Sequence, residues 1–332
     1  MTKHAKRMML IAVVALMAPV ASLGVASSAL AKEPTGDFAV FKQCPRFTAG
    51  VVLCLDSQIE SGEVTLNKLT VPITNATMLQ GGVTLNSQFQ STFVGALNGE
   101  TLSKTPQPVP GGLSSLINCN EIKGKGFLGR ARRGTCRAVF ENSWSFAGAD
   151  ETVELAGPAS EIGFSLLGVG GNGTVLSLPV RIHLESPLLG RECYIGTSAD
   201  PIMFNMTLGT TSPPEPNKPI SGKYGQESLR DESSFAEVMG HSLVNNTFSA
   251  PEATGCGGHF SFFIDPLIDS RIGLPSPAGY NTVIHVGLAD SGQVGAVIAS
   301  EQESQPSEKE SPPSEKWHEK RGQGKDPTRW RH

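Results

Sequence analysis

A cluster of basic residues between two cysteines is the densest chemical signal in this sequence. The segment from Cys119 to Cys136 carries five basic side chains against the single acidic Glu121, and a sixth follows it: Lys123, Lys125, Arg130, Arg132, Arg133 and Arg137. Its four glycines predict a flexible loop. Ammonium and guanidinium groups gathered in this way bind polyanions. We therefore expect contact with an anionic cell-wall polymer or a membrane surface; a solvated hairpin tip is the alternative.

Motifs for nucleophilic catalysis are incomplete. Gly240-His241-Ser242 begins like a nucleophile elbow, but Val244 stands where the sharp turn needs a second glycine. The sequence contains no zinc-protease, P-loop or β-lactamase motif. We expect no cofactor and assign no catalytic residue. A secreted hydrolase whose site is assembled from distant residues stays open as the alternative.

Two further pairs of side chains have metal-ligating chemistry. His183 and His285 are expected on the strand faces opposite the apolar stripes, where they could pair or bind a metal with nearby carboxylates. Asp265 and Asp269 lie one helical turn apart and could share a cation, although capping and solvation explain them equally well. We predict no metal site.

The N-terminus has the pattern of an export signal. Lys3, Lys6 and Arg7 precede an apolar stretch from Met8 to Leu23, and Ala29-Leu30-Ala31 forms a small-x-small cleavage site. A retained membrane anchor is the alternative. We interpret residues 1–31 as a signal peptide and expect a secreted protein that can associate with the cell wall.

Export changes the interpretation of the six cysteines, because an even number in an exported chain favours disulfides. They are Cys44, Cys54, Cys119, Cys136, Cys193 and Cys256. Sequential pairing is the economical choice among many, since each pair then encloses one local unit. Loops of 11, 18 and 64 residues would stabilise the fold by about 2.7, 3.2 and 4.3 kcal/mol in the loop-entropy model. Zinc is the weaker alternative, because no Cys-x-x-Cys pair is present.

Composition excludes several classes of protein. The 332 residues are 39% hydrophobic and 17% charged, with 37 glycines. These values exclude a disordered chain, a collagen-like chain and a multi-span membrane protein. The formal net charge of −4 becomes −7 without the three basic residues of the signal segment. We expect no nucleic-acid partner.

The elements that position these residues are mostly extended, because apolar residues recur at every second position. The clearest stripes are Leu176, Leu178, Val180, Ile182 and Leu184, then Ile202, Phe204, Met206 and Leu208, then Thr282, Ile284, Val286 and Leu288. A phase slip at Asn67-Lys68 indicates a turn or a bulge. Alternation with one polar face is typical of antiparallel sheets.

Two segments predict helices. Phe260, Phe263, Ile264, Leu267 and Ile268 follow helical spacing. Because Pro266 lies inside this stripe, we expect the helix to begin there with Asp265 as its cap and to end near Gly273. A second short helical turn is expected at Leu113–Ile117.

Residues 301–332 differ from the rest of the chain. They are rich in Glu, Lys, Ser, Pro and Gln, with Trp317 and Trp330 as the only large apolar side chains. Since so little apolar surface cannot offset chain entropy, we predict a disordered tail. Its basic end is a second candidate contact for anionic surfaces, with a solvated tail as the alternative.

The sequence contains the local runs Cys193-Tyr194-Ile195-Gly196, Leu208-Gly209-Thr210-Thr211, Gly255-Cys256-Gly257-Gly258 and Asp265-Pro266-Leu267-Ile268-Asp269. These runs resemble a family of uncharacterised secreted proteins of high-GC Gram-positive bacteria. The resemblance covers most of residues 36–290. It implies an exported location and a β architecture, and it brings no activity and no site residue with it.

Together these patterns predict a mainly β protein. We expect an antiparallel β-sandwich over residues 32–300 with one or two short helices, and a disordered C-terminal tail over 301–332. Division into two subdomains near Gly157 stays open. The expected function is a non-enzymatic binding or structural protein of the cell envelope.

Overall fold

A computed structural model describes residues 32–301. The description omits five short stretches within that range, which are residues 87–89, 123, 125, 142–147 and 170–172. The predicted signal peptide (1–31), the tail from residue 302 onwards, and Lys123 and Lys125 of the basic cluster therefore lie outside the described residues.

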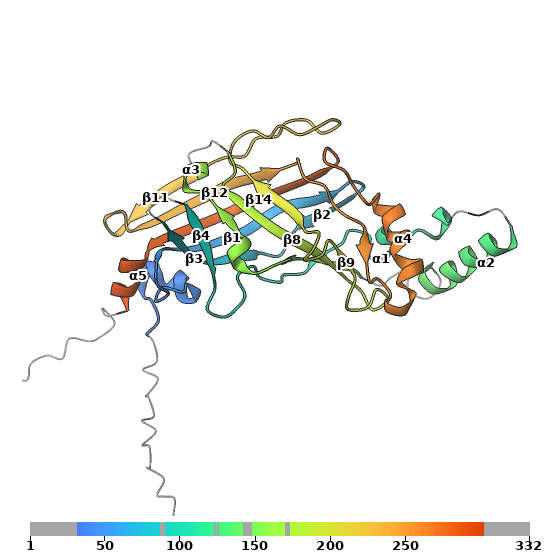
Figure 1. The fold of residues 1–332 in the computed structure, drawn as a ribbon, viewed down its shortest axis with the longest axis horizontal. Helices are drawn as coiled ribbons and strands as arrows, with labels where there is room; N and C mark the ends of the chain where they lie inside the picture. The colour runs from blue at the N-terminus through green and yellow to red at the C-terminus, as the bar shows by residue number, and fades with distance from the viewer. Residues whose placement is uncertain are drawn as a thin grey trace, which may run out of the picture. The chain divides into compact units, whose positions relative to one another are not determined.

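The fold is mainly β and consists of two antiparallel sheets, as the period-two patterns predicted (Figure 1). Sheet A has the strand order β11-β12-β14-β1-β3-β4, and β2 also pairs with β1. Its strands are β1 (Val51–Leu66), β2 (Leu69–Ile73), β3 (Thr77–Leu85), β4 (Ser91–Gly95), β11 (Gln226–Arg230), β12 (Phe235–Asn245) and β14 (Asn281–Gln293). The long strand β1 pairs with β14 along most of its length, so the first and the last strand of the described fold are neighbours at the centre of sheet A.

Sheet B is organised around β8, which pairs with β6, β7, β9 and β10. Its strands are β5 (Gln107–Pro108), β6 (Asp150–Leu155), β7 (Gly163–Phe164), β8 (Leu176–Glu185), β9 (Tyr194–Ile195), β10 (Ile202–Met206) and β13 (Ala253–Thr254). The inner faces of both sheets share one hydrophobic core, which includes Val64 and Val83 from sheet A and Leu178, Ile182 and Phe204 from sheet B. Strands from both sides of Gly157 thus contribute to that core.

Short helices connect and cover the sheets. The α-helices are α1 (Leu113–Leu116), α2 (Phe127–Cys136), α3 (Leu166–Val169), α4 (Ser261–Ile272) and α5 (Val294–Ser300). The 3₁₀-helical segments are η1 (Gly36–Gln43), η2 (Cys119–Glu121), η4 (Ala159–Glu161), η5 (Asp231–Ser233) and η6 (Gly258–Phe260), and η3 (Arg137–Glu141) is a short π-helix. α1 forms where a helical turn was predicted. α4 packs against α1 and η2 at one end of the sandwich.

The strand predictions have one error of phase. The stripe from Leu176 to Leu184 is buried as predicted, and Asn67-Lys68 forms the turn between β1 and β2. In β14, however, the stripe from Thr282 to Leu288 is only half-buried, whereas Val283 and His285 face the core. Directly paired residues of neighbouring strands lie on the same face of a sheet, and Val283 is paired with the buried Val64 of β1. This face of β14 therefore points to the opposite sheet, where the Phe204 ring of β10 packs edge-on against the His285 ring with centroids 6.4 Å apart.

The start of α4 was also predicted wrongly. The helix begins at Ser261, five residues before Pro266, and it ends as expected at Gly273, which adopts a left-handed conformation with φ 91°. Asp265 is not the cap. Its carboxylate instead accepts hydrogen bonds from the backbone N–H groups of Cys256 (2.8 Å) and Gly255 (3.2 Å).

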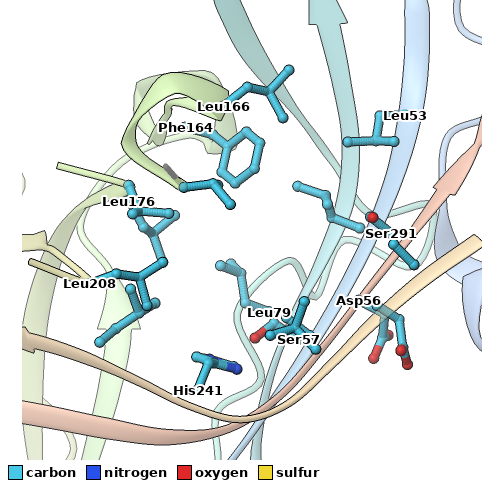
Figure 2. A pocket seen from close by; sticks show the side chains of 18 of the residues that line it. Leu53, Asp56, Ser57, Leu79, Phe164, Leu166, Leu176, Leu208, His241 and Ser291 are labelled. Carbon is cyan, nitrogen blue, oxygen red and sulfur yellow. The ribbon is translucent and has the colours of Figure 1, made fainter. Parts of the chain in front are cut away.

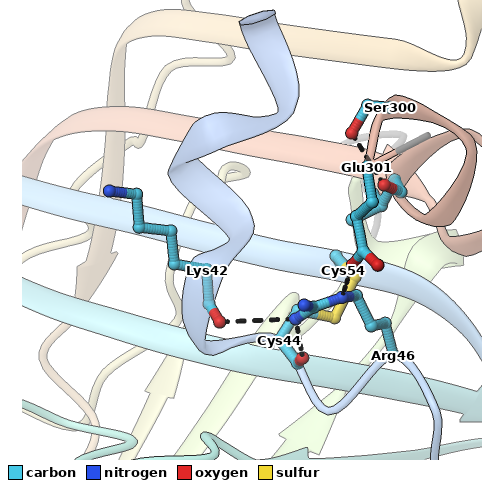
Figure 3. Close-up of a disulfide and its surroundings, with 7 residues drawn as sticks. Lys42, Cys44, Arg46, Cys54, Ser300 and Glu301 are labelled. Carbon is cyan, nitrogen blue, oxygen red and sulfur yellow. Dashed lines mark hydrogen bonds and ion pairs between the residues drawn. A yellow bond between two sulfur atoms is a disulfide. The ribbon is translucent and has the colours of Figure 1, made fainter. Parts of the chain in front are cut away.

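The three disulfides follow sequential order: Cys44–Cys54, Cys119–Cys136 and Cys193–Cys256. The first lies in a second, smaller core, where η1 and α5 cover the outer face of sheet A (Figure 3). Beside it, the buried Arg46 guanidinium binds the buried Glu301 carboxylate and also donates to the carbonyl oxygen of Cys44. Glu301, predicted as the first residue of the tail, is therefore part of the folded body.

Candidate functional site

An apolar cavity of about 250 Å³ lies between the two sheets (Figure 2). One wall comes from β1, β3, β4, β12 and β14 of sheet A, and the other from β7, α3 and the start of β8. The apolar lining includes Leu53, Leu55, Leu79, Phe93, Phe164, Leu166, Leu176, Leu208 and Leu243. Several of these leucines are only partly buried, because the opposite sheet does not reach them.

Small side chains on sheet A create this space. Leu55, Ser291 and Ala236 form one cross-strand row over β1, β14 and β12, and the next inward-facing row is Ser57, Ala289 and Val238. Four of these six positions carry Ser or Ala, where larger residues would fill the gap. An unfilled apolar volume of 250 Å³ in a sealed core would cost about 6 kcal/mol at about 24 cal/mol per Å³. That cost is comparable with the whole stability of a domain, so a partly open cavity of this size indicates a ligand site.

His241 is a buried polar residue of the cavity wall. Its imidazole is 5% exposed, and its Nδ1 atom has no hydrogen-bond partner. Burial lowers the pKa of His241, against an opposing hydrogen bond to Val238 and the charge of Glu60, so the ring is neutral at pH 7. A neutral imidazole offers one donor and one acceptor nitrogen, which makes this group able to bind a hydroxyl.

A β-bulge places His241 on the inner face. The register between β12 and β14 shifts between Met239 and His241, and the extra residue Gly240 has φ 67°. Met239 points outward and is 47% exposed, so regular alternation would have put His241 on the outer face as well. The run that resembled a nucleophile elbow is thus a bulged strand. A glycine in the interior of a strand was the available sequence signal.

Two carboxyl groups lie on the opposite side of the same sheet. Asp56 and Asp290 are directly paired across β1 and β14, with Glu237 next to Asp290 on β12. Burial raises the pKa of Asp56 to about 6, and burial together with the charges of Glu237 and Asp56 raises the pKa of Asp290 to about 6. One oxygen of each has no partner. Figure 2 shows the Asp56 carboxylate pointing away from the cavity. Asp290, as the direct cross-strand partner of Asp56, lies on the same face of the sheet.

A second acid and base lie deeper in the core. Glu151 and His285 line a cavity of about 30 Å³, which has room for about one water molecule. Burial raises the pKa of Glu151 to about 8 and, with the nearby His241, lowers the pKa of His285 to about 4. Both groups are therefore neutral at pH 7. His285 was expected on an open polar face and is instead 6% exposed.

His183 belongs to a polar network on the outer face of sheet B. Its Nδ1 atom lies 3.3 Å from Glu185 and 3.6 Å from Glu154, and its ring stacks on Tyr194 with centroids 4.4 Å apart. Arg181 donates to Glu154 over 2.8 Å. His183 and His285 do not meet. In the part of the chain that the structure describes, no group of three or more His, Cys, Asp or Glu side chains could hold a metal ion.

Asp265 and Asp269 act as acceptors for the backbone. Besides the two bonds to Asp265, the Asp269 carboxylate accepts from the N–H of Ala253 over 2.8 Å. Both carboxylates therefore hold the segment 253–256 against α4.

The predicted flexible loop between Cys119 and Cys136 contains the helix α2. Arg133, in the last turn of this helix, fixes it to the segment that precedes it by donating from Nη1 to the carbonyl oxygens of Ile122 (2.8 Å) and Gly124 (3.0 Å). Arg137 likewise binds the side chain of Asn120. Arg130 and Arg132 are exposed and make no ion pair within the described residues.

α2 extends away from the two sheets beyond α1 and α4 (Figure 1). Its buried residues are Gly129, which lies against Gly124 of the same loop, and the disulfide-bonded Cys136. The first two residues of the helix are strongly exposed, Phe127 at 79% and Leu128 at 73%. The helix thus presents two large apolar side chains next to arginines, a combination that the count of basic residues did not predict.

Comparisons with known proteins provide no relative: no family model, no curated protein and no solved structure matches this chain. Among the described residues, no helix is long and apolar enough to cross a membrane.

Proposed function

We propose that this protein is an exported binding protein of the cell envelope that attaches to an anionic membrane surface through α2. The outward face of α2 is the observation that carries the proposal. Three disulfides support an oxidising location, and the export pattern of residues 1–31 agrees with that location.

The arrangement of side chains around α2 favours a lipid surface. Successive helical residues lie about 100° apart, so Phe127, Leu128 and Ala131 share the side opposite the buried Gly129. Arg130 and Arg132 then lie on the two flanks of this apolar face. Helices that rest in a membrane interface combine apolar burial with attraction to anionic headgroups in this way.

An anionic wall polymer carries negative charge like an anionic membrane, but it has no apolar interior in which side chains could be buried. Arginine flanks alone would suit both surfaces, whereas Phe127 and Leu128 gain burial only in a bilayer. We therefore commit to the membrane, and binding to an isolated wall polymer is the contrary outcome of the test.

Vesicle sedimentation with the purified oxidised protein tests the proposal. Vesicles of phosphatidylglycerol and phosphatidylcholine should bind the protein, and pure phosphatidylcholine should bind it weakly. Arg130→Gln with Arg132→Gln should weaken binding roughly 30-fold, at about 1 kcal/mol for each basic residue near an anionic surface. Arg133 is excluded from this variant because it fixes the base of the helix.

Matched controls separate this surface from general charge. Arg191→Gln removes another exposed arginine and Leu229→Ala another exposed leucine, and both should bind vesicles like the wild type. Phe127→Ala with Leu128→Ala should weaken vesicle binding and leave polyanion binding unchanged. Equal binding by the Phe127/Leu128 variant, or binding to teichoic-acid-type polymer without binding to vesicles, would refute membrane attachment.

A further inference from the structure

We propose that the cavity between the sheets binds a neutral lipid with a single aliphatic chain and a hydroxyl head group that bonds to His241. The site lies within the sandwich, and it rests on different residues from those of α2. Its evidence is therefore independent of membrane attachment.

The dimensions of the cavity select a chain. Its inner wall runs along β1 from Leu53 to Ser57, which is about 13 Å at about 3.3 Å per residue. A volume of about 250 Å³ lies below the range of about 300–1,000 Å³ that is usual for pockets of drug-sized ligands. The cavity therefore has room for one short hydrocarbon chain.

The lining selects an aliphatic ligand with few polar atoms. Leucine, valine, alanine and phenylalanine from both sheets make most of the surface (Figure 2). The small residues Ala236, Ala289 and Ser291 form two adjacent rows on the floor, so the space is built into the sheet. Exposed Leu166 and Tyr224 at the rim leave a route for entry.

His241 and the surrounding charges select the head group. His241 is 5% exposed, and its Nδ1 atom has no hydrogen-bond partner. The bulge at Gly240 places this side chain on the cavity wall. The charged groups of the lining residues are all acidic: Glu227 on β11, and Asp56 and Asp290 on the far side of the sheet. The lining residues include no Lys or Arg that could neutralise a fatty-acid carboxylate, whereas a hydroxyl can bond to the neutral ring without bringing a charge into an apolar site.

Calorimetric titration with 1-octanol and with octanoate tests the assignment on the full mature protein. We expect saturable binding of 1-octanol, with octanoate at least tenfold weaker. Long-range ¹H–¹⁵N spectra of the imidazole nitrogens should show a shift of the His241 Nδ1 signal when 1-octanol binds. Octanoate binding as tight as 1-octanol, or an unchanged His241 signal, would overturn the head-group assignment.

A cavity-filling variant tests the location. Ala289→Leu places a larger side chain into the floor of the cavity and should weaken 1-octanol binding at least tenfold while raising the melting temperature. The control Ala299→Leu adds the same atoms to an exposed position of α5 and should leave binding unchanged. Wild-type affinity in Ala289→Leu, or no 1-octanol binding by the wild type, would refute the site. A melting temperature at or above that of the wild type shows that a loss of binding in Ala289→Leu does not come from misfolding.

Discussion

Glu151 gives the sharpest test of the interior of this protein. Its side chain is 2% exposed and lines the small core cavity together with Gln107, Phe204 and His285. Burial holds the carboxyl protonated by raising its pKa from 4.5 to about 8. A carboxyl whose pKa is raised in the folded state contributes most at low pH, and its contribution is lost as the pH rises through the folded pKa.

The size of the effect follows from linkage. Between pH 9 and pH 7 the folded state takes up most of one proton at Glu151, while the unfolded state takes up almost none, so the free energy of unfolding should rise by about 1 kcal/mol. The buried histidines oppose this rise by only a few tenths, since their unfolded pKa lies near 6.5. Glu151→Gln removes the titration and should flatten the curve. At pH 7 the variant should be more stable by up to about 3 kcal/mol, the cost of protonating the carboxyl on folding.

Urea denaturation of the oxidised protein, followed by circular dichroism at half-unit steps from pH 7 to pH 9, measures both effects. Glu161→Gln, which changes an exposed glutamate, is the matched control and should follow the wild type. Parallel pH dependence of the wild type and Glu151→Gln would refute the reasoning, because it would mean that Glu151 is already ionised in the folded state at pH 7.

Three further predictions concern stability. Asp56→Asn should raise the free energy of unfolding at pH 7 by about 1 kcal/mol, discounted for solvent screening, and the gain should vanish as the pH falls from 6 to 3.8 in denaturant titrations. Glu301→Gln removes the carboxylate that binds the buried Arg46 guanidinium and should cost about 3 kcal/mol, measured in the same way; an unchanged midpoint would argue against docking of α5. Replacing Cys193 and Cys256 with Ala should cost about 4 kcal/mol of stability, which is more than the cost of replacing Cys44 and Cys54, whose disulfide closes the 11-residue loop. Thermal scans in which the Cys44/Cys54 variant is the less stable of the two would contradict the loop-entropy explanation.

The functional surfaces were only partly predictable. The cluster of basic residues could be recognised in the sequence, but the role of each arginine could not be predicted. In the structure Arg133 fixes the helix, whereas Arg130 and Arg132 are exposed. Phe127 and Leu128 looked like two apolar residues in a glycine-rich loop. Their exposure follows from the direction in which the helix leaves the Cys119–Cys136 disulfide.

The sequence by itself determined the β class, because strand periodicity and turn residues are local properties. The slip at Asn67-Lys68 and the stripe of β8 were predictable for the same reason. The phase of β14 and the start of α4 were not, since the opposite sheet decides which face of β14 is buried. The cavity also required the tertiary structure. Rows of small residues become a floor only when β1, β12 and β14 are aligned in register, and one bulge decides whether His241 faces water or the interior.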